Sequence, residues 1–417
     1  MVDVAERMML TGNAAAAWGA RLAAVEYVPA FPITPQTEII ELLADWFTEG
    51  SLRGKFVTLD SEHSMLTAAG AAAVAGVRVF SATSSQGLVY ALETLYTTSG
   101  WRVPMVMVNV SRGLSAPITL GPDHNDILAA RDAGWIQLHA ESCQEVLDFI
   151  LLAYRIAEDP RVSAPAPVNL DGFQLSFTRE AVELPTREQA RRFLPRRASV
   201  HPTFSRSTPL AHGVAVLDGA SYSYFRYQLH RALENAVEVF HDAAGEFAEA
   251  CRRRYEATDD YRMEDAELAL VMIGSSATLG KQAVDRWRDQ GVRIGLVRPR
   301  LLRPLPVERL RRSLGATRAV AIVDQNLAPG AGGILRQELA TALYDLPSRP
   351  ALHSFVCGLG GKEMSDAEFD RMLAVLQQPQ AQSPQLTSEL LMTQAERAKV
   401  AKALAAAGKE QIDHASR

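Results

Sequence analysis

The chain has 417 residues, of which 47% are hydrophobic and 22% are charged, values typical of a globular protein large enough for two or more domains. Its net charge of −5 offers no reason to expect nucleic acid or an anionic membrane as a partner, and no apolar run reaches membrane-spanning length. The amino-terminal residues carry early acids and lack a basic-then-apolar signal pattern, so we expect a cytoplasmic protein.

In residues 1–180, short apolar runs alternate with segments of helical periodicity. The runs predicted as strands are VEYVPAFPI, RVFSAT, PMVMVNVSR, GWIQLHA and PAPVNLDGF. This alternation predicts an α/β fold with a parallel sheet whose two faces are covered by helices. Ligands of such sheets bind at the carboxyl ends of the strands, so the residues that directly follow each strand are the first candidates for a functional site.

The first strand end has the sequence FPITPQTE, from Phe31 to Glu38. Two prolines flank Ile33 and Thr34 and stiffen the backbone, so this loop can present the Thr34 hydroxyl in a fixed position. Taken alone, the residues favour the simpler interpretation that Thr34 caps a helix beginning at Pro35.

A carboxylate stands at the start of the next predicted helix. In the stretch TLDSEHSMLTAAGAAAVAG, Ser61 is a plausible N-cap and Glu62 an acid in the first turn, where the helix dipole favours it by roughly 0.3–1 kcal/mol. The Ala and Gly residues that follow allow another backbone to approach closely, whereas large apolar residues would fill a core better. Glu62 is therefore either a helix-start acid or a functional carboxylate at a close interface.

Polar residues follow the next predicted strand as well. The stretch SATSSQGL places the hydroxyls of Ser84 and Ser85 and the amide of Gln86 at a strand end, although helix capping explains them equally well.

Arg112 directly follows a later strand. Its guanidinium fork matches the two oxygens of a carboxylate. The alternative is that Arg112 pairs with one of the nearby acids and that the stretch PDHND, which contains Asp123, His124, Asn125 and Asp126, is a helix cap.

The rest of the chain divides by composition. Residues 181–257 begin as an extended stretch containing Pro and Arg and end in a long helix, which we interpret as a connector. A second β–α array spans 258–376, with predicted strands LALVMIGSS, VRIGLVRPR, AVAIVDQN and ALHSFVCGLG. Residues 377–417 form a Pro/Gln linker and a polar, Ala-rich tail helix from Ser388 to Gly408, which we expect to dock on a partner chain; a self-contained surface helix is the alternative.

Several motifs are absent. Cys143, Cys251 and Cys357 lie more than a hundred residues apart, so we expect reduced, mostly buried thiols and no iron–sulfur cluster held by this chain alone. There is no Walker loop, nucleophile elbow or zinc helix signature. The GAGG stretch at Gly330–Gly333 precedes a helix and either cradles an anion or forms a helix-opening glycine turn.

Taken together, the motifs resemble those of the alpha subunits of the 2-oxoacid:acceptor oxidoreductases, a thiamine-diphosphate-dependent family that includes pyruvate:ferredoxin oxidoreductase. The stretches that carry the resemblance are FPITP, Ser61–Glu62, TSSQGL, SRGLSAP, DHND, RDAGWIQ, NLDGF, RPRLLRPLP, DQNLAPGAGG and GLGGKE. They occur in order over nearly all of the chain before Leu376, which makes the resemblance far more specific than any one motif.

The resemblance implies an enzyme that decarboxylates a 2-oxoacid, passes two electrons to iron–sulfur clusters and yields an acyl-CoA. It implies that residues 1–180 bind the aminopyrimidine of thiamine diphosphate and that 258–376 form a transketolase C-terminal-like domain. Glu62 matches the glutamate that hydrogen-bonds a pyrimidine nitrogen and activates the cofactor.

The same resemblance assigns further site residues. Ser84, Ser85 and Gln86 fall in the cofactor site, and Thr34 and Arg112 match positions that contact the substrate, Arg112 at its carboxylate.

One loop departs from the family pattern. It reads GPDHND where we expect Gly-Asp-His, so Pro122 is an insertion beside the candidate substrate-loop residues Asp123, His124 and Asn125. The substrate therefore stays open between pyruvate and a bulky 2-oxoacid such as phenylglyoxylate, the substrate of another branch of the family.

The implied cofactor also needs Mg²⁺ held by a Gly-Asp-Gly type motif, and no GDG occurs in this sequence. We therefore expect no metal ligands in this chain, a beta subunit that supplies the diphosphate half of the site, and [4Fe–4S] clusters in partner chains of the beta, gamma and delta type. Electrons would pass to ferredoxin or to an NAD-reducing subunit. A non-catalytic structural subunit is the alternative, and the joint retention of Glu62, Thr34 and Arg112 argues against it.

Overall fold

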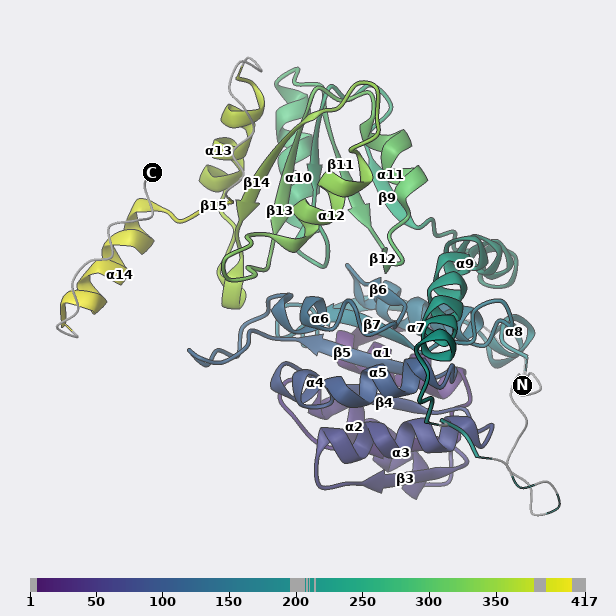
Figure 1. The fold of residues 1–417 in the computed structure, drawn as a ribbon. Coiled ribbons are helices and arrows are strands. Elements are labelled where there is room, and N and C mark those ends of the chain that lie inside the picture. Colours follow the sequence, from purple (N-terminus) through teal and green to yellow (C-terminus); the bar gives the residue numbers. More distant parts are fainter. Residues whose placement is uncertain are drawn as a thin grey trace. The chain divides into compact units, whose positions relative to one another are not determined.

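The computed structural model describes residues 6–195, 207, 209, 211–213, 215–378 and 388–406. The chain forms two compact units. The first consists of residues 1–259 with 273–275 and 299–309, and the second consists of residues 260–272, 276–298 and 310–417. In both, helices cover a sheet that is largely parallel, which confirms the predicted α/β fold (Figure 1).

The main sheet of the first unit has five strands in the order β12-β6-β7-β5-β4. Their bounds are β4 (Phe80–Thr83), β5 (Val106–Ser111), β6 (Gln137–His139), β7 (Ala166–Asp171) and β12 (Leu301–Arg303). All strands from β4 to β7 are parallel, whereas β12 runs antiparallel to β6. Every residue of β4 to β7 is buried, which explains why these strands read as continuous apolar runs and not as alternating patterns.

Two smaller strand pairs complete the first unit. A parallel pair consists of β2 (Tyr27–Ala30) and β3 (Lys55–Thr58), and a single bridge joins Tyr27 of β2 to Val79, directly before β4. An antiparallel pair consists of β1 (Glu6–Thr11) and β8 (Arg179–Leu184).

The helices of the first unit differ in how deeply they are buried. Their bounds are α1 (Gly12–Leu22), α2 (Thr37–Thr48), α3 (Glu62–Val74), α4 (Gln86–Tyr90), α5 (Leu92–Gly100), α6 (Asn125–Ala129), α7 (Cys143–Ala157), α8 (Arg187–Phe193) and α9 (Gly219–Cys251). Almost every residue of α7 is buried, and it packs on the small residues of α1. A Cβ at Gly19 would lie only 3.0 Å from Ile150, so this glycine permits the close approach of the two helices.

Two helix starts test the predicted caps. Ser61 is the N-cap of α3 and accepts a hydrogen bond from the Ser64 amide, as expected. In contrast, α2 begins at Thr37 after the N-cap residue Gln36, so Thr34 is not a helix cap. The Thr34–Pro35 peptide is cis, and Pro35 lies outside the helix.

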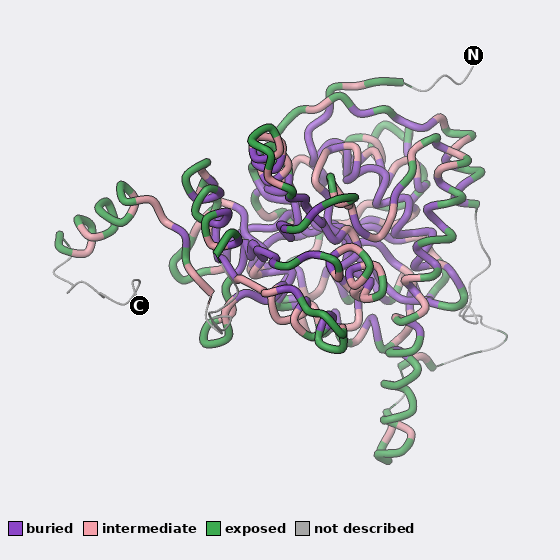
Figure 2. Tube along the Cα trace, turned by 90° about the horizontal axis from the view of Figure 1, so that it is seen from above, coloured by how far each residue is buried: buried purple, intermediate pink, exposed green. Residues whose placement is uncertain are grey.

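The described residues of the predicted connector belong to the first unit. They form β8, α8 and the 33-residue helix α9, whose carboxyl-terminal half is packed on the core. Most of the residues from Gly219 to Arg231 of α9 are exposed (Figure 2). The aromatic side chains of Tyr222, Tyr224 and Phe225 lie in this part of the chain and are exposed as well.

A six-stranded sheet in the order β15-β14-β13-β10-β11-β9 forms the second unit. The strands are β9 (Thr258–Tyr261), β10 (Leu268–Val271), β11 (Ile294–Pro299), β13 (Ala319–Asp324), β14 (Ala351–Val356) and β15 (Glu389–Leu390). The helices are α10 (Ala277–Asp289), α11 (Val307–Leu314), α12 (Ile334–Ala342), the 3₁₀ turn η1 (Leu359–Gly361) and α13 (Asp366–Leu376). Residues 299–309, within the range predicted for the second domain, join the first unit through β12.

The GAGG stretch before α12 is a helix-opening glycine turn. A carboxylate oxygen of Asp324 accepts a hydrogen bond from the Leu335 amide at 2.8 Å, and Gly333 has no Cβ to block it. The chain's own carboxylate therefore stands where an anion would bind.

The tail differs from its prediction at one end. Glu389 and Leu390 pair with β14 as an edge strand and Leu391 is buried, so the helix α14 (Gln394–Ala406) begins six residues later than predicted. No residue of α14 is buried, as the exposed helix beside the C-terminus in Figure 2 shows. Residues 407 and 408 of the predicted helix lie outside the described residues.

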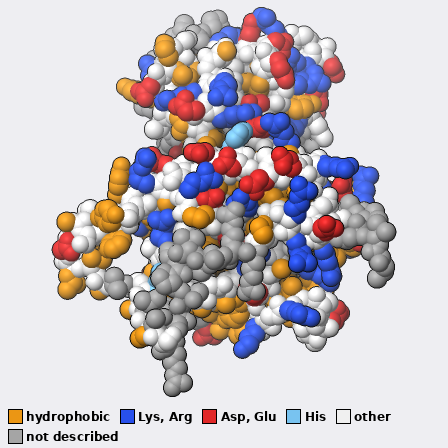
Figure 3. Space-filling model, turned by 90° about the vertical axis from the view of Figure 1, so that its right-hand side faces the viewer, with side chains coloured by type: hydrophobic (Ala, Val, Ile, Leu, Met, Phe, Trp, Pro, Cys, Tyr) orange, Lys and Arg blue, Asp and Glu red, His pale blue; other side chains and the backbone are white. Residues whose placement is uncertain are grey.

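The surface carries charges of both signs, which are interspersed over the face drawn in Figure 3. Among the described residues, no helix is both long and apolar enough to cross a membrane.

Candidate active site

The predicted site residues meet at the carboxyl ends of neighbouring strands. In the sheet register, Thr83 of β4 lies beside Asn109 of β5, and Ser111 at the end of β5 lies beside Asp171 of β7. Because parallel strands end at one edge, the loops that follow them converge there.

Arg112 joins two of these loops. Its Nη1 donates to the carbonyl oxygen of Thr34 at 2.7 Å, and its Nη2 donates to Oε1 of Gln86 at 2.6 Å. The side chain is only 7% exposed, and burial lowers the pKa of the guanidinium while the carboxylate of Asp126 counteracts the shift. Among the described residues the side-chain hydrogen bonds of Arg112 go to neutral groups, and its link to an acid of the PDHND stretch is the hydrogen bond from its backbone amide to Asp126.

Glu62 is the first residue of α3 and is 6% exposed. Within the described part of the chain its carboxylate has neither a hydrogen bond nor an ion pair. Gly87 lies against it, since a Cβ at position 87 would be 2.4 Å from Oε1 of Glu62 and 2.6 Å from Oγ1 of Thr83. The residue is largely buried, but its carboxylate oxygens are not among the fully enclosed atoms, so they stay open to a hydrogen-bond donor that a ligand can supply.

Further unsatisfied polar atoms lie in the same loops. The buried atoms without a hydrogen-bond partner among the described residues include Thr83 Oγ1, Ser84 Oγ, Gln86 Nε2 and Arg112 Nε. Buried polar atoms are normally hydrogen-bonded, so this concentration at one sheet edge indicates a ligand site. One carboxylate with neighbouring hydroxyl and amide groups fits a flat heterocycle that carries ring nitrogens and an amino group, as an aminopyrimidine does.

Asp126, the last residue of the PDHND stretch, holds these loops in place. Its fully buried carboxylate accepts hydrogen bonds from the backbone amides of Ser85 and Arg112 and from the side chains of Asn109 and Ser111. Burial raises the pKa of Asp126, and these hydrogen bonds oppose the rise. The polar Asn109 inside an otherwise apolar strand was the available signal for such a partner.

The Ser85 side chain also serves these loops. Its hydroxyl lies 2.9 Å from the Gly113 carbonyl oxygen and 2.6 Å from Oε1 of Gln86, and these two acceptors share its single proton. The backbone of Ser85 adopts a positive φ of 51°. Such a φ is uncommon for a non-glycine residue, and the bonds from both its amide and its hydroxyl hold it.

The candidate substrate loop is mostly buried. His124 is fully buried and its Nε2 bonds Oδ1 of Asp171 at 2.7 Å, while Oδ2 of Asp171 accepts from both the amide and the hydroxyl of Ser275. Asp123 is also buried and accepts a hydrogen bond from the Asn125 amide. The structure therefore places His124 in a buried pair that ties the loop to β7.

Electrostatic attraction between His124 and Asp171 favours the charged form of both side chains. Burial disfavours the charged imidazole, but the Asp171 carboxylate outweighs it and raises the pKa of His124. Burial likewise opposes ionisation of Asp171, yet its bonds to His124 and Ser275 hold its pKa below the ordinary value.

The described residues offer neither a metal-binding cluster nor an exposed thiol. Over the described residues, no group of three or more His, Cys, Asp or Glu side chains is arranged to hold a metal ion. All three cysteines are free and buried, and burial raises the pKa of Cys251 and Cys357 to about 12.

Two family models match the chain. The thiamine-diphosphate-binding model of the pyruvate flavodoxin/ferredoxin oxidoreductases matches residues 18–244, and that of pyruvate:ferredoxin oxidoreductase core domain II matches residues 266–369.

Curated relatives are similar over most of their length. The pyruvate synthase subunit PorA of Pyrococcus abyssi is 38% identical over 88% of this chain and 93% of its own, and that of Thermotoga maritima is 39% identical over 87% and 93%. The ketoisovalerate oxidoreductase subunit VorA of Pyrococcus abyssi is 38% identical over 86% and 90%.

A solved structure shares the fold. The 2-oxoglutarate:ferredoxin oxidoreductase from Magnetococcus marinus, with 2-oxoglutarate, coenzyme A and succinyl-CoA bound, superposes with a TM-score of 0.70 at 18% identity. The match covers 89% of this chain, which spans 65% of that neighbour's length. By its domain matches and its relatives, this chain belongs to the family of alpha subunits of the 2-oxoacid:ferredoxin oxidoreductases.

Proposed function

We propose that this chain is the alpha subunit of an enzyme that converts a 2-oxoacid and CoA to an acyl-CoA and CO₂. Two electrons leave in the reaction and pass to iron–sulfur clusters in partner chains. The names of the relatives support the enzyme class, and the unpaired carboxylate of the largely buried Glu62 is the observation that supports the catalytic role.

The residues at the sheet edge suit the pyrimidine half of thiamine diphosphate. When bound, the cofactor supplies the ylid chemistry that decarboxylation of a 2-oxoacid requires. Glu62 would hold a proton at a ring nitrogen, and Ser84, Ser85 and Gln86 would line the ring. Gly87 keeps the space in front of the Glu62 carboxylate open because it carries no Cβ.

Arg112 is suited to hold the substrate carboxylate. It is already positioned by Thr34 and Gln86, and its unsatisfied Nε leaves hydrogen-bonding capacity for an anion. The relatives act on pyruvate and ketoisovalerate by name, so a small aliphatic 2-oxoacid is the first candidate. The loop with Pro122 keeps a bulkier acid, such as phenylglyoxylate, as the second.

Partner chains would complete the site. Exposed apolar side chains project from the loops at the same sheet edge, with Ile118 76% exposed and Leu120, Phe173 and Phe177 also exposed. Such side chains are suited to an interface. A beta subunit would cover them and supply the diphosphate-binding residues and Mg²⁺, while gamma- and delta-type chains would lead electrons to ferredoxin or to an NAD-reducing subunit.

The test is a Glu62→Gln variant assembled with its partner chains. Gln is nearly isosteric but cannot stabilise the protonated ring, so we expect turnover to fall by about 10²–10⁴ while assembly is kept. Turnover is followed as the 2-oxoacid- and CoA-dependent bleaching of iron–sulfur absorbance, with pyruvate, ketoisovalerate and phenylglyoxylate as substrates.

Glu188→Gln is the matched control. Glu188 is also an acid in the first turn of a helix, but it is exposed and lies in α8. If both variants turn over at the wild-type rate, Glu62 is only a helix-start acid and the alternative of a non-catalytic structural subunit gains support.

A further inference from the structure

A cavity in the first unit lies away from the candidate active site. It is a cavity of about 990 Å³, lined by residues 24–26, 51–53 and 76–78 and by Pro104. These segments directly precede β2, β3, β4 and β5. The cavity therefore lies at the amino ends of the parallel strands, the edge opposite to the loops that carry the candidate active site.

Five arginine side chains line this cavity: Arg21, Arg53, Arg78, Arg187 and Arg191. Arg78 forms two hydrogen bonds to Glu158 at 2.7 and 2.8 Å, which compensate its charge. Among the described residues, none of the other four guanidinium groups has a hydrogen bond or an ion pair. Glu6 and Glu26 are the remaining acids of the lining, so positive charge is in excess.

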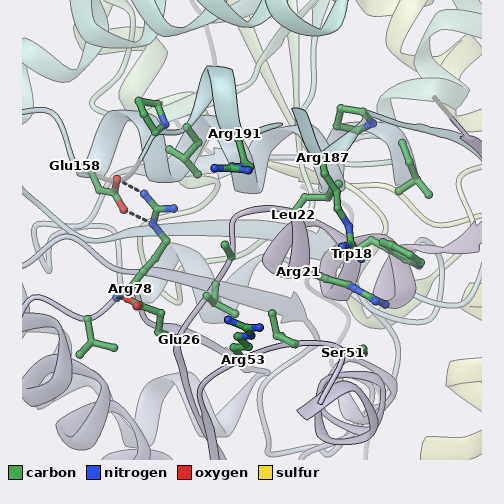
Figure 4. A pocket seen from close by; sticks show the side chains of 18 of the residues that line it. Trp18, Arg21, Leu22, Glu26, Ser51, Arg53, Arg78, Glu158, Arg187 and Arg191 are labelled. Atoms are coloured by element: carbon green, nitrogen blue, oxygen red, sulfur yellow. Dashed lines mark hydrogen bonds and ion pairs between the residues drawn. The ribbon is translucent and has the colours of Figure 1, made fainter. Parts of the chain in front are cut away.

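The four arginines come from three segments of the first unit. Figure 4 shows Arg187 and Arg191 reaching into the cavity from α8, with Arg53 on the opposite side and Arg21 beside Trp18. Arg187 and Arg191 are four residues apart on one helix face, where like charges are destabilising unless an anion lies between them. Arg192, the next residue along α8, does not line the cavity.

Arg21 is held in place before any ligand binds. Its guanidinium carbon lies 4.9 Å from the ring centre of Trp18 and 4.5 Å from that of Trp46. Burial, together with repulsion from Arg187, lowers the pKa of Arg21, and the carboxylate of Glu49 opposes part of this shift. A guanidinium positioned in this way loses little conformational entropy on binding an anion.

We propose that this cavity binds a nucleoside polyphosphate, whose phosphates contact Arg21, Arg53, Arg187 and Arg191. The guanidinium fork matches phosphate oxygens in two hydrogen bonds, and several such groups suit a polyphosphate better than a single anion. The volume is sufficient for a nucleotide, since small-molecule sites occupy roughly 300–1,000 Å³.

The rest of the lining can take the base. Trp18, Leu22, Pro185 and Leu194 form an apolar wall of the cavity. The ligand is distinct from the 2-oxoacid, because it binds at the opposite edge of the sheet from Arg112. The inference is independent of the proposed reaction.

Calorimetric titration of the full chain with ADP, tripolyphosphate and adenosine tests the assignment. ADP is expected to bind, tripolyphosphate to bind more weakly, and adenosine to give no signal. The double substitution Arg187→Gln/Arg191→Gln removes two charged contacts and should weaken the affinity for ADP by about tenfold or more. Arg192→Gln is the control and should change the ADP affinity by less than about twofold, because the altered side chain lies outside the cavity.

Thermal unfolding of each variant first establishes that it folds like the wild type. The proposal is overturned if ADP gives no binding heat at millimolar concentration, or if Arg192→Gln weakens ADP as much as the double variant does. Equal affinity for tripolyphosphate and ADP would show that the apolar wall does not bind the base, and would overturn the assignment to a nucleoside polyphosphate. Tighter binding of a poly-glutamate peptide than of ADP assigns the cavity to an acidic protein segment instead.

Discussion

Replacing Gly87 with Ala should move the Glu62 carboxylate without removing any functional group. The new Cβ would lie 2.4 Å from Oε1 of Glu62, and ordinary van der Waals contact begins at 3.4 Å. The carboxylate oxygen therefore has to move by about 1 Å, the difference between these distances. Thr83 Oγ1, at 2.6 Å, is displaced as well.

The expected loss of rate follows from that displacement. A misplacement of about 1 Å at a reacting group costs about 10²-fold in rate. The backbone itself should tolerate the change, because Gly87 is helical and has no positive φ. Folding and assembly are therefore expected to stay intact while turnover falls.

Gly245→Ala in α9 is the matched control. Nothing lies within 4 Å of a Cβ built at Gly245, so the substitution only adds helix propensity, worth roughly 0.5–1 kcal/mol. Turnover is measured as 2-oxoacid-dependent reduction of an electron acceptor by the assembled complex, and stability by thermal unfolding. A Gly87→Ala complex that turns over as fast as the Gly245→Ala complex would refute the role of the Glu62 position.

Two further predictions concern Arg112 and the buried pair of His124 and Asp171. Arg112→Lys loses the guanidinium fork that bridges Thr34 and Gln86, so we expect KM to rise about tenfold or more for every 2-oxoacid. The ratio of kcat/KM for pyruvate to kcat/KM for ketoisovalerate should stay unchanged. A shifted ratio would contradict the role of Arg112 as an anchor that contacts only the substrate carboxylate. Asp171→Asn leaves buried His124 without its counter-charge and should cost about 3–5 kcal/mol of stability. Because the pKa of His124 is raised in the folded protein, the pair stabilises the fold below the unfolded pKa of about 6.5, and this stability is lost as the pH rises through the folded pKa. Because the pKa of Asp171 is lowered, the pair stabilises the fold above the unfolded pKa of about 4, and this stability is lost in acid. The difference in melting temperature between wild type and variant should therefore be largest between about pH 4 and 6.5 and shrink at higher pH, and a constant difference from pH 5 to 9 would show that the pair is not charged.

Local patterns in the sequence were sufficient for the α/β class and for the polar strand ends. Strand and helix periodicity depends on neighbouring residues, so FPITP, TSSQGL and SRGLSAP could be placed after strands without knowledge of the sheet. The order of those motifs identified the family, which the domain matches and relatives confirm. Helix starts were harder to predict, because the hydroxyl of Thr34 indicated a cap, whereas α2 begins at Thr37 with Gln36 as its N-cap residue.

Contacts between distant residues were decided only by the tertiary structure. Arg112 bonds the carbonyl of Thr34, 78 residues away, and Leu301 of β12 pairs with Leu138 of β6. The close contact between Gly87 and Glu62 and the arginine-lined cavity likewise depend on which strands are neighbours and on their register. Nothing in a single stretch of sequence encodes strand order, because many pairings satisfy the same local periodicity and only the packing of the whole core selects one.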